Sequence, residues 1–129
     1  MTISVVNTDQ APAAIGPYSQ AVVAGNMLFV SGQIPLDPST GETVDGDISG
    51  QTKRVLENLK AVIEAAGSRM SHVVKVTIYL TDMKQFSVVN EIYGSYFSAP
   101  YPARACVQVS ELPKGVQVEM DAIAQLSTS

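Results

Sequence analysis

The sequence contains very few of the residues on which most small metalloproteins and hydrolases rely. It has one cysteine, one histidine and no tryptophan in 129 residues. A single cysteine excludes a disulfide within the chain and a metal site built from several cysteines, and a single histidine excludes a histidine cluster. Most zinc enzymes, disulfide-stabilised scaffolds and hydrolases that depend on a second histidine are therefore excluded.

Basic residues and long apolar runs are also scarce. Eight Lys and Arg face twelve Asp and Glu, which leaves a net charge of −4, whereas a nucleic-acid partner bound through its phosphates requires a basic surface. No apolar stretch approaches the roughly 18–20 residues that span a bilayer. Residues 1–9 have neither the basic nor the apolar region of a secretory signal. The sequence thus predicts a soluble cytoplasmic protein with no membrane partner, and it argues against a nucleic-acid partner.

What the sequence does contain is enough apolar material for one domain. Apolar residues make up 46% of the chain and charged residues 16%. A chain of this length buries about two-thirds of its unfolded surface on folding. There is no internal repeat, low-complexity tract or linker, so residues 1–129 are expected to form a single domain.

Two segments have the apolar spacing of amphipathic helices. In residues 49–66, apolar side chains such as Val55, Leu59 and Val62 recur at intervals of three and four, and Gly67 suits the end of a helix. Residues 84–97 carry an aromatic-rich stripe and stop before Pro100.

The other apolar segments are short and alternating, as strands are. We expect the order strand, strand, helix, strand, helix, strand, strand, with the last two strands paired across the turn at residues 112–115. This order predicts an α+β sheet with helices on one face. The expected strands are residues 19–24, 27–31, 73–80, 105–109 and 116–124.

The first hairpin is apolar on both of its faces. Leu28 and Val30 share one face, and Met27 and Phe29 share the other. Because two helices cover only one face of such a sheet, the second face must be solvated, covered by loops or buried against another subunit. We favour self-association.

Arg104 and Glu119 are the strongest candidates for chemistry. If the last two strands pair, both side chains project to the same side of the sheet. An arginine there can bind a carboxylate through its planar fork, and a nearby carboxylate can orient or deprotonate a water. The competing interpretation is a surface ion pair, and the pattern alone favours it.

Other polar residues carry weaker signals. Cys106 shares the strand face of Arg104, but without a base to form a thiolate it is better interpreted as a small packed hydrophobe. Tyr18 is interpreted as a core aromatic. Asn90 lies beside the apolar stripe of the second helix, where it either caps a loop or reaches a ligand. The glycines near Gly32 do not fit a nucleotide-binding loop.

Several segments also resemble a known family in the family's own order. Residues 102–107 (Pro-Ala-Arg-Ala-Cys-Val) and 118–120 (Val-Glu-Met) are similar to the C-terminal signature of the RidA (YjgF) family. Residues 16–21, 29–33 and 88–90 resemble it as well, so that the resemblance covers nearly the whole chain.

The resemblance implies a chorismate-mutase-like fold, which is a mixed β-sheet of about six strands with two helices packed on one face. It also implies a homotrimer with ligand sites between subunits. The family's activity is enamine/imine deamination, in which 2-aminoacrylate-type intermediates, 2-iminobutanoate and 2-iminopropanoate are hydrolysed to 2-oxo acids and ammonia. This chemistry requires no metal or cofactor, because the imine carbon is already electrophilic.

The resemblance also assigns roles to individual residues. It implies that Arg104 binds the substrate carboxylate and that Glu119 holds the attacking water. The implied substrate-binding positions are Tyr18, Ser31, Gly32, Asn90 and Cys106.

Two other functions remain open. The same pocket could hold a small carboxylate without turnover, as a binding or regulatory module on the same trimeric scaffold. RNA cleavage is also attached to this family, and the net charge weighs against it.

Overall fold

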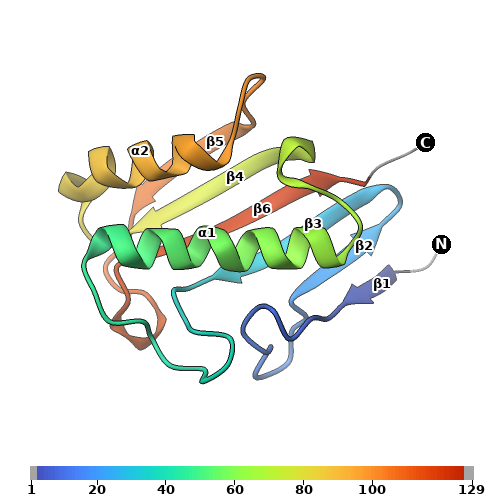
Figure 1. The fold of residues 1–129 in the computed structure, drawn as a ribbon, viewed down its shortest axis with the longest axis horizontal. Helices are drawn as coiled ribbons and strands as arrows, with labels where there is room; N and C mark the ends of the chain where they lie inside the picture. Colours follow the sequence, from blue (N-terminus) through green and yellow to red (C-terminus); the bar gives the residue numbers. More distant parts are fainter. Residues whose placement is uncertain (1–2, 127–129) are drawn as a thin grey trace.

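The chain folds into one mixed β-sheet with two α-helices, as a computed structural model describes it for residues 3–126 (Figure 1). The sheet has six strands in the order β1-β2-β3-β6-β4-β5. This arrangement confirms the predicted α+β fold class. The strands are β1 (Ile3–Val6), β2 (Ala21–Ala24), β3 (Met27–Gln33), β4 (Val73–Leu80), β5 (Ala103–Gln108) and β6 (Val118–Gln125). The helices are α1 (Ile48–Ala65) and α2 (Phe86–Tyr96), with short 3-10 helices at Met70–His72, Met83–Gln85 and Pro113–Gly115.

Helix α1 has the ends and the apolar stripe that its sequence predicts. The Asp47 side chain accepts a hydrogen bond from the Gly50 amide at 3.1 Å and caps the first turn. After the last turn, Gly67 adopts a φ of +86°, the left-handed conformation that glycine takes without strain. Neither helix of the described residues is long and apolar enough to cross a membrane.

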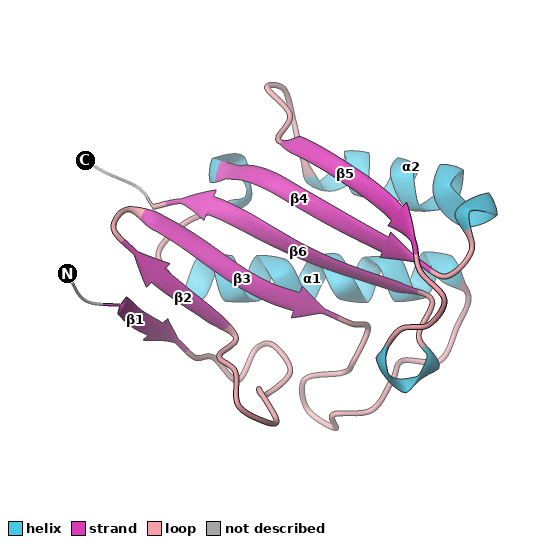
Figure 2. Ribbon diagram, turned by 180° about the vertical axis from the view of Figure 1, so that it is seen from behind, coloured by secondary structure: helices cyan, strands magenta, loops and turns pink. Residues whose placement is uncertain are grey.

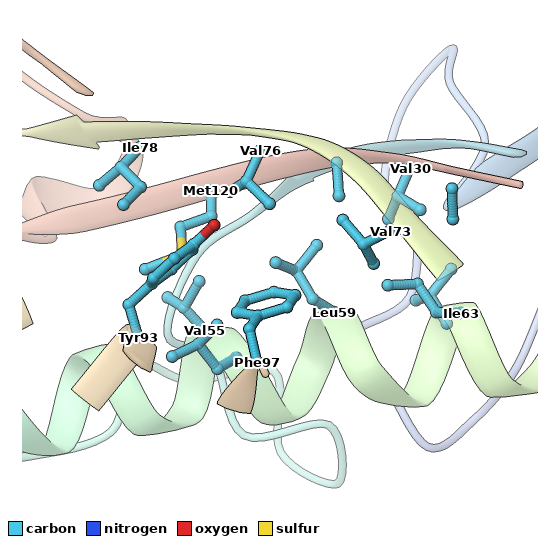
Figure 3. Close-up of a cluster of buried hydrophobic side chains, with 14 of the residues drawn as sticks. Val30, Val55, Leu59, Ile63, Val73, Val76, Ile78, Tyr93, Phe97 and Met120 are labelled. Atoms are coloured by element: carbon cyan, nitrogen blue, oxygen red, sulfur yellow. The ribbon is translucent and has the colours of Figure 1, made fainter. Parts of the chain in front are cut away.

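The core lies between the helices and one face of the sheet (Figure 3). The apolar stripe of α1 points at the central strands. The rings of Tyr93 in α2 and of Phe97, the residue that follows this helix, pack beside it with centroids 4.6 Å apart. Burying these side chains supplies most of the driving force for docking the helices. Core residues include Val55, Leu59 and Ile63 from α1, and Val30, Val76 and Met120 from the sheet.

The order of the last strands differs from the prediction. Strands β5 and β6 are not paired, because β4 lies between them and runs parallel to β5 and antiparallel to β6. Parallel neighbours require a crossover, and α2 provides it between β4 and β5. The turn-like sequence at residues 112–115 is part of a longer connection that passes the end of β4. The predicted hairpin was therefore wrong.

The second face of the sheet carries no helix in the described part of the chain (Figure 2). Apolar side chains such as Val5, Phe29 and Val107 are exposed on it, at 65%, 42% and 43%. The prediction that two helices cover only one face is confirmed. Burial of the second face against another subunit stays a prediction.

The segment between β3 and α1 is tied down by one buried amide. The Asn58 side chain is fully buried and donates to the carbonyl oxygens of Ile34 and Leu36 at 3.2 and 3.0 Å. Buried carbonyls without such partners would be unfavourable. Asn58 therefore fixes the segment that, as described below, forms one wall of a cavity beside Glu119.

Candidate active site

Arg104 lies on the helix-covered face of the sheet. It pairs across the parallel ladder with Val76, which is fully buried under the helices. Its guanidinium therefore reaches α2, where the Asn90 Oδ1 accepts a hydrogen bond from Nη1 at 2.6 Å. A cavity of about 460 Å³ opens beside it. The cavity is lined by Asn90, Tyr93, Gly94, Tyr101, Pro102 and Arg104.

Glu119 lies on the opposite, open face. It pairs across the β4–β6 ladder with Tyr79, three residues along β4 from the partner of Arg104. Its carboxylate is half-buried at the edge of a larger cavity of about 740 Å³. The walls of that cavity include Tyr18, Gly32, Ile34, Leu36, Lys114 and Glu119.

One chain therefore keeps the two predicted catalytic residues apart. Because side chains alternate along a strand, the partners Val76 and Tyr79 point to opposite faces, and so do Arg104 and Glu119. The two Cα atoms are also separated by about 10 Å along the strands and about 10 Å across them. The prediction that both project to the same side was wrong, because it assumed the β5–β6 hairpin. A surface ion pair between them within one chain is excluded for the same reason.

The Glu119 carboxyl is in an environment that favours its protonated form. Burial raises its pKa above the ordinary value of 4.5, and the neighbouring Asp121 carboxylate raises it further. Asp121 is held in place by the Tyr79 hydroxyl, which donates to its Oδ2 at 2.9 Å. A carboxylate whose pKa is raised towards neutrality is a stronger base once it is ionised.

Gly32 leaves the space that the Glu119 carboxylate occupies. Ser31 and Gly32 lie in the irregular register of β3 between Val30 and Gln33. A Cβ atom added to Gly32 would overlap Glu119 Oε2. Only glycine therefore allows the carboxylate to lie directly against the backbone of β3.

Tyr18 and Ser31 belong to the Glu119 side of the molecule. Tyr18 is 55% exposed and lines the larger cavity, so its interpretation as a core aromatic was wrong. The Ser31 hydroxyl donates to the Ser19 carbonyl at 2.6 Å, and the Ser31 amide donates to the Gln20 carbonyl at 2.9 Å. These bonds attach the segment that follows Tyr18 to β3.

Cys106 lies on the Arg104 side, two residues further along β5. It is half-buried and packs against the hydrophobic core. Burial raises the pKa of its thiol, and the nearby Arg104 lowers it by less. The side chain is therefore a neutral thiol at neutral pH, in keeping with a packed hydrophobe rather than a nucleophile. Within residues 3–126, no group of three or more His, Cys, Asp and Glu could hold a metal ion.

Two features near these residues were not found from the sequence. The guanidinium carbon of Arg104 lies over the rings of Tyr93 and Phe86, at 4.9 and 5.4 Å from their centroids. The sequence predicts the aromatic stripe of α2, but it gives no sign that two of its rings contact a cation. Within one chain, Asn90 bonds to Arg104 and not to a loop, and it lines the cavity beside Arg104, so that its contact with a ligand stays a prediction.

The charge of Asp121 provides a test of the electrostatics around Glu119. We expect Asp121→Asn to lower the pKa of Glu119, because the substitution removes one of the two causes of the raised value. Burial, the other cause, should keep this pKa above 4.5. A carboxyl-carbon NMR titration of Glu119 in both proteins measures this. An unchanged Glu119 titration in Asp121→Asn would contradict this explanation of the raised pKa.

The raised pKa of Glu119 also affects stability. Since folding raises this pKa, Glu119 reduces the stability of the protein as the pH rises through the folded pKa, and Glu119→Gln should flatten that decline.

Comparison with known proteins matches almost the whole chain. The family profile described as Endoribonuclease L-PSP matches residues 8–126. A RutC family protein of Pyrococcus abyssi is 56% identical over 124 residues, covering 96% of this chain and 98% of the relative. The mouse 2-iminobutanoate/2-iminopropanoate deaminase is 50% identical over 120 residues, covering 93% of this chain and 89% of the relative.

Solved structures match as closely. A crystal structure of a Thermotoga maritima protein superimposes with a TM-score of 0.93 at 57% identity, covering 96% of this chain and 98% of that one. The structure of E. coli TdcF with bound serine has a TM-score of 0.90 at 43% identity, covering 96% of this chain and 99% of that one. At 57% and 43% identity, the chain shares sequence as well as fold with these two proteins.

Proposed function

Because the chain belongs to the endoribonuclease L-PSP family, which includes the RidA-type proteins, we propose that it hydrolyses 2-imino acids to 2-oxo acids and ammonia. The substrates would be small products such as 2-iminobutanoate and 2-iminopropanoate. The reaction would make the protein a hydrolase of C=N bonds that uses Arg104 and Glu119.

The observation that carries the proposal is the complementary chemistry of the two separated sites. Arg104 presents a guanidinium whose one side-chain hydrogen bond, within residues 3–126, is to the neutral Asn90. Such a fork is matched to a substrate carboxylate. Glu119 presents a half-buried carboxylate beside a cavity large enough for substrate and water.

A 2-imino acid would need both groups within a few ångströms, because its imine carbon is bonded directly to the carboxylate carbon. One chain separates Arg104 and Glu119 by a strand and by the thickness of the sheet. We therefore propose that the site forms between copies, with Arg104 from one subunit and Glu119 from a neighbour. The exposed edge strand β5 and the exposed apolar residues of the open face support burial against a second copy, and a homotrimer is the assembly we expect.

The proposed chemistry needs one water and one base. Arg104 holds the carboxylate, and the ionised Glu119 accepts a proton as the water oxygen bonds to the imine carbon. The C=N double bond becomes a C–N single bond as the imine nitrogen takes up the proton that Glu119 has accepted. The carbinolamine hydroxyl then gives its proton to Glu119, which passes it to the amino nitrogen. A C=O bond forms, and ammonia leaves with the C–N electron pair. Atoms balance as imine plus water giving 2-oxo acid plus ammonia.

Relatives support a small carboxylate ligand. The mouse relative is a deaminase of 2-iminobutanoate and 2-iminopropanoate, and TdcF is solved with serine bound. An imino acid derived from an amino acid of this size carries the same carboxylate. RNA cleavage, which the family description names, has less support here because the chain carries a net charge of −4.

The proposal predicts that both charged residues are required for turnover. With 2-iminobutanoate generated in situ by a threonine dehydratase, the wild-type protein should accelerate imine loss over buffer. Both Arg104→Ala and Glu119→Gln should reduce kcat/KM by about 100-fold or more, because the first loses the carboxylate anchor and the second loses the base. Light scattering on the same samples reports the oligomer.

The controls separate catalysis from simple binding. Glu119→Gln should still bind 2-oxobutanoate, as judged by thermal stabilisation, whereas Arg104→Ala should not. Stabilisation of the wild type by 2-oxobutanoate without imine hydrolysis would identify a non-catalytic binding module. Full activity in folded Arg104→Ala would remove the proposed anchor.

Gly32 provides an independent test of the position of Glu119. In Gly32→Ala, the added methyl group would displace the flexible end of Glu119. We expect a loss of turnover of about tenfold or more with a change in unfolding free energy below about 1 kcal/mol. Imine hydrolysis and urea unfolding measure the two quantities. Gly50→Ala in the first turn of α1 is the control, because a Cβ atom there meets only ordinary contacts at 3.9 Å. Unchanged activity in Gly32→Ala would argue against Glu119 as the base.

A further inference from the structure

We propose that Phe86 and Tyr93 form an aromatic cradle that orients the Arg104 guanidinium for carboxylate binding before substrate arrives. The inference rests on the proposed function, since it concerns how the carboxylate anchor of that reaction is held. It assigns positioning roles to two residues of α2 that are otherwise accounted for as parts of the apolar core.

The cradle is built by the spacing of one helix face. Phe86, Asn90 and Tyr93 follow one another at intervals of four and three, so that they lie on the same side of α2. That side meets β5 at Arg104. The guanidinium carbon lies over the Tyr93 ring at 4.9 Å and over the Phe86 ring at 5.4 Å from the ring centroids.

The two kinds of contact hold the guanidinium in complementary ways. Aromatic faces attract a cation electrostatically and do not compete for its N–H donors. The Asn90 oxygen accepts from Nη1 at 2.6 Å and fixes rotation about the long side chain. Among the described residues 3–126, the guanidinium has a neutral amide and two rings as partners and no carboxylate, which is the state an anion site requires.

The Tyr93 hydroxyl shows which part of that residue matters. Tyr93 is 4% exposed, and its hydroxyl is the one buried side-chain polar atom in the described part of the chain without a hydrogen-bond partner. Burial of a hydroxyl without a partner is unfavourable. The ring is therefore the useful part of Tyr93, because it stacks on Phe97 and contacts Arg104.

Orientation of this kind has a specific kinetic consequence. Arg104 contacts the carboxylate, which does not react, so it binds the substrate and the transition state to a similar extent. Losing the cradle should therefore raise KM and leave kcat nearly unchanged. A mutation that only loosened the core would lower stability without this selective change.

The test compares variants that keep or remove a ring. Tyr93→Phe keeps the ring and should retain KM, with unchanged or increased stability. Tyr93→Leu and Phe86→Leu remove one ring each and should raise KM about fivefold, with kcat within about twofold of wild type. Tyr96→Leu is the matched control, because that tyrosine lies on the same helix and bonds to Glu57 instead.

A second readout does not depend on activity. The Nε–H signal of Arg104 in ¹⁵N NMR reports how rigidly its side chain is held. This side chain should be rigid in the wild type and in Tyr93→Phe, and mobile in Tyr93→Leu and Phe86→Leu. Should Tyr93→Leu fail to fold, Phe86→Leu, which changes a half-buried ring, carries the test.

The outcomes separate the two proposals. Equal KM and equal Arg104 order in the folded ring-removal variants would overturn the cradle even if the enzyme is active. An inactive wild type whose Arg104 order depends on both rings would overturn the deaminase proposal and retain the cradle as the device that orients Arg104. Raised KM with reduced Arg104 order supports both.

Discussion

Strand β4 lies between β5 and β6, and this strand order determines where the two candidate catalytic residues can lie. It places Arg104 and Glu119 on two different neighbours of one strand. Their β4 partners, Val76 and Tyr79, are separated by an odd number of residues, so the alternation of side chains sends the two charges to opposite faces. No rotamer of either side chain changes this. A reaction that needs both groups at one carbon atom therefore needs more than one copy of the chain.

Each half of the proposed site is supported by its own part of the fold. On the helix-covered face, α2 supplies the amide of Asn90 and two aromatic rings, which hold a cation without neutralising it. On the open face, Gly32 in the irregular part of β3 leaves room for the Glu119 carboxylate. Burial, and after it the Asp121 carboxylate of β6, raise the pKa of Glu119. One half therefore presents a guanidinium that can bind an anion, and the other presents a carboxyl group that is a base once ionised, which are the two groups that the proposed hydrolysis uses.

The sequence predicts much of this fold because its main signals are local. The helix spacing of residues 49–66, the cap at Gly67 and the alternation of the strands all follow from contacts between near neighbours in the chain. The pairing of β5 with β4 depends on α2 as a crossover, which is not a local signal. The turn-like sequence at residues 112–115 indicated a hairpin between β5 and β6 instead. The same error placed Arg104 and Glu119 together. The rings around Arg104 were missed because an aromatic stripe that packs in a core and one that contacts a cation have the same spacing.

If one site takes Arg104 and Glu119 from different copies of the chain, two inactive variants should restore activity when they are mixed. Arg104→Ala and Glu119→Gln are unfolded, mixed in equal amounts and refolded together, and 2-iminobutanoate hydrolysis is compared with each variant refolded alone. In an equal mixture, half of the subunits carry an intact Arg104 and half carry an intact Glu119. If the site is shared, random assembly therefore gives both intact residues at about a quarter of the sites. Recovery of about a quarter of the wild-type activity per chain is the predicted result. A mixture that stays as inactive as its components, while sizing shows mixed oligomers, would contradict the claim.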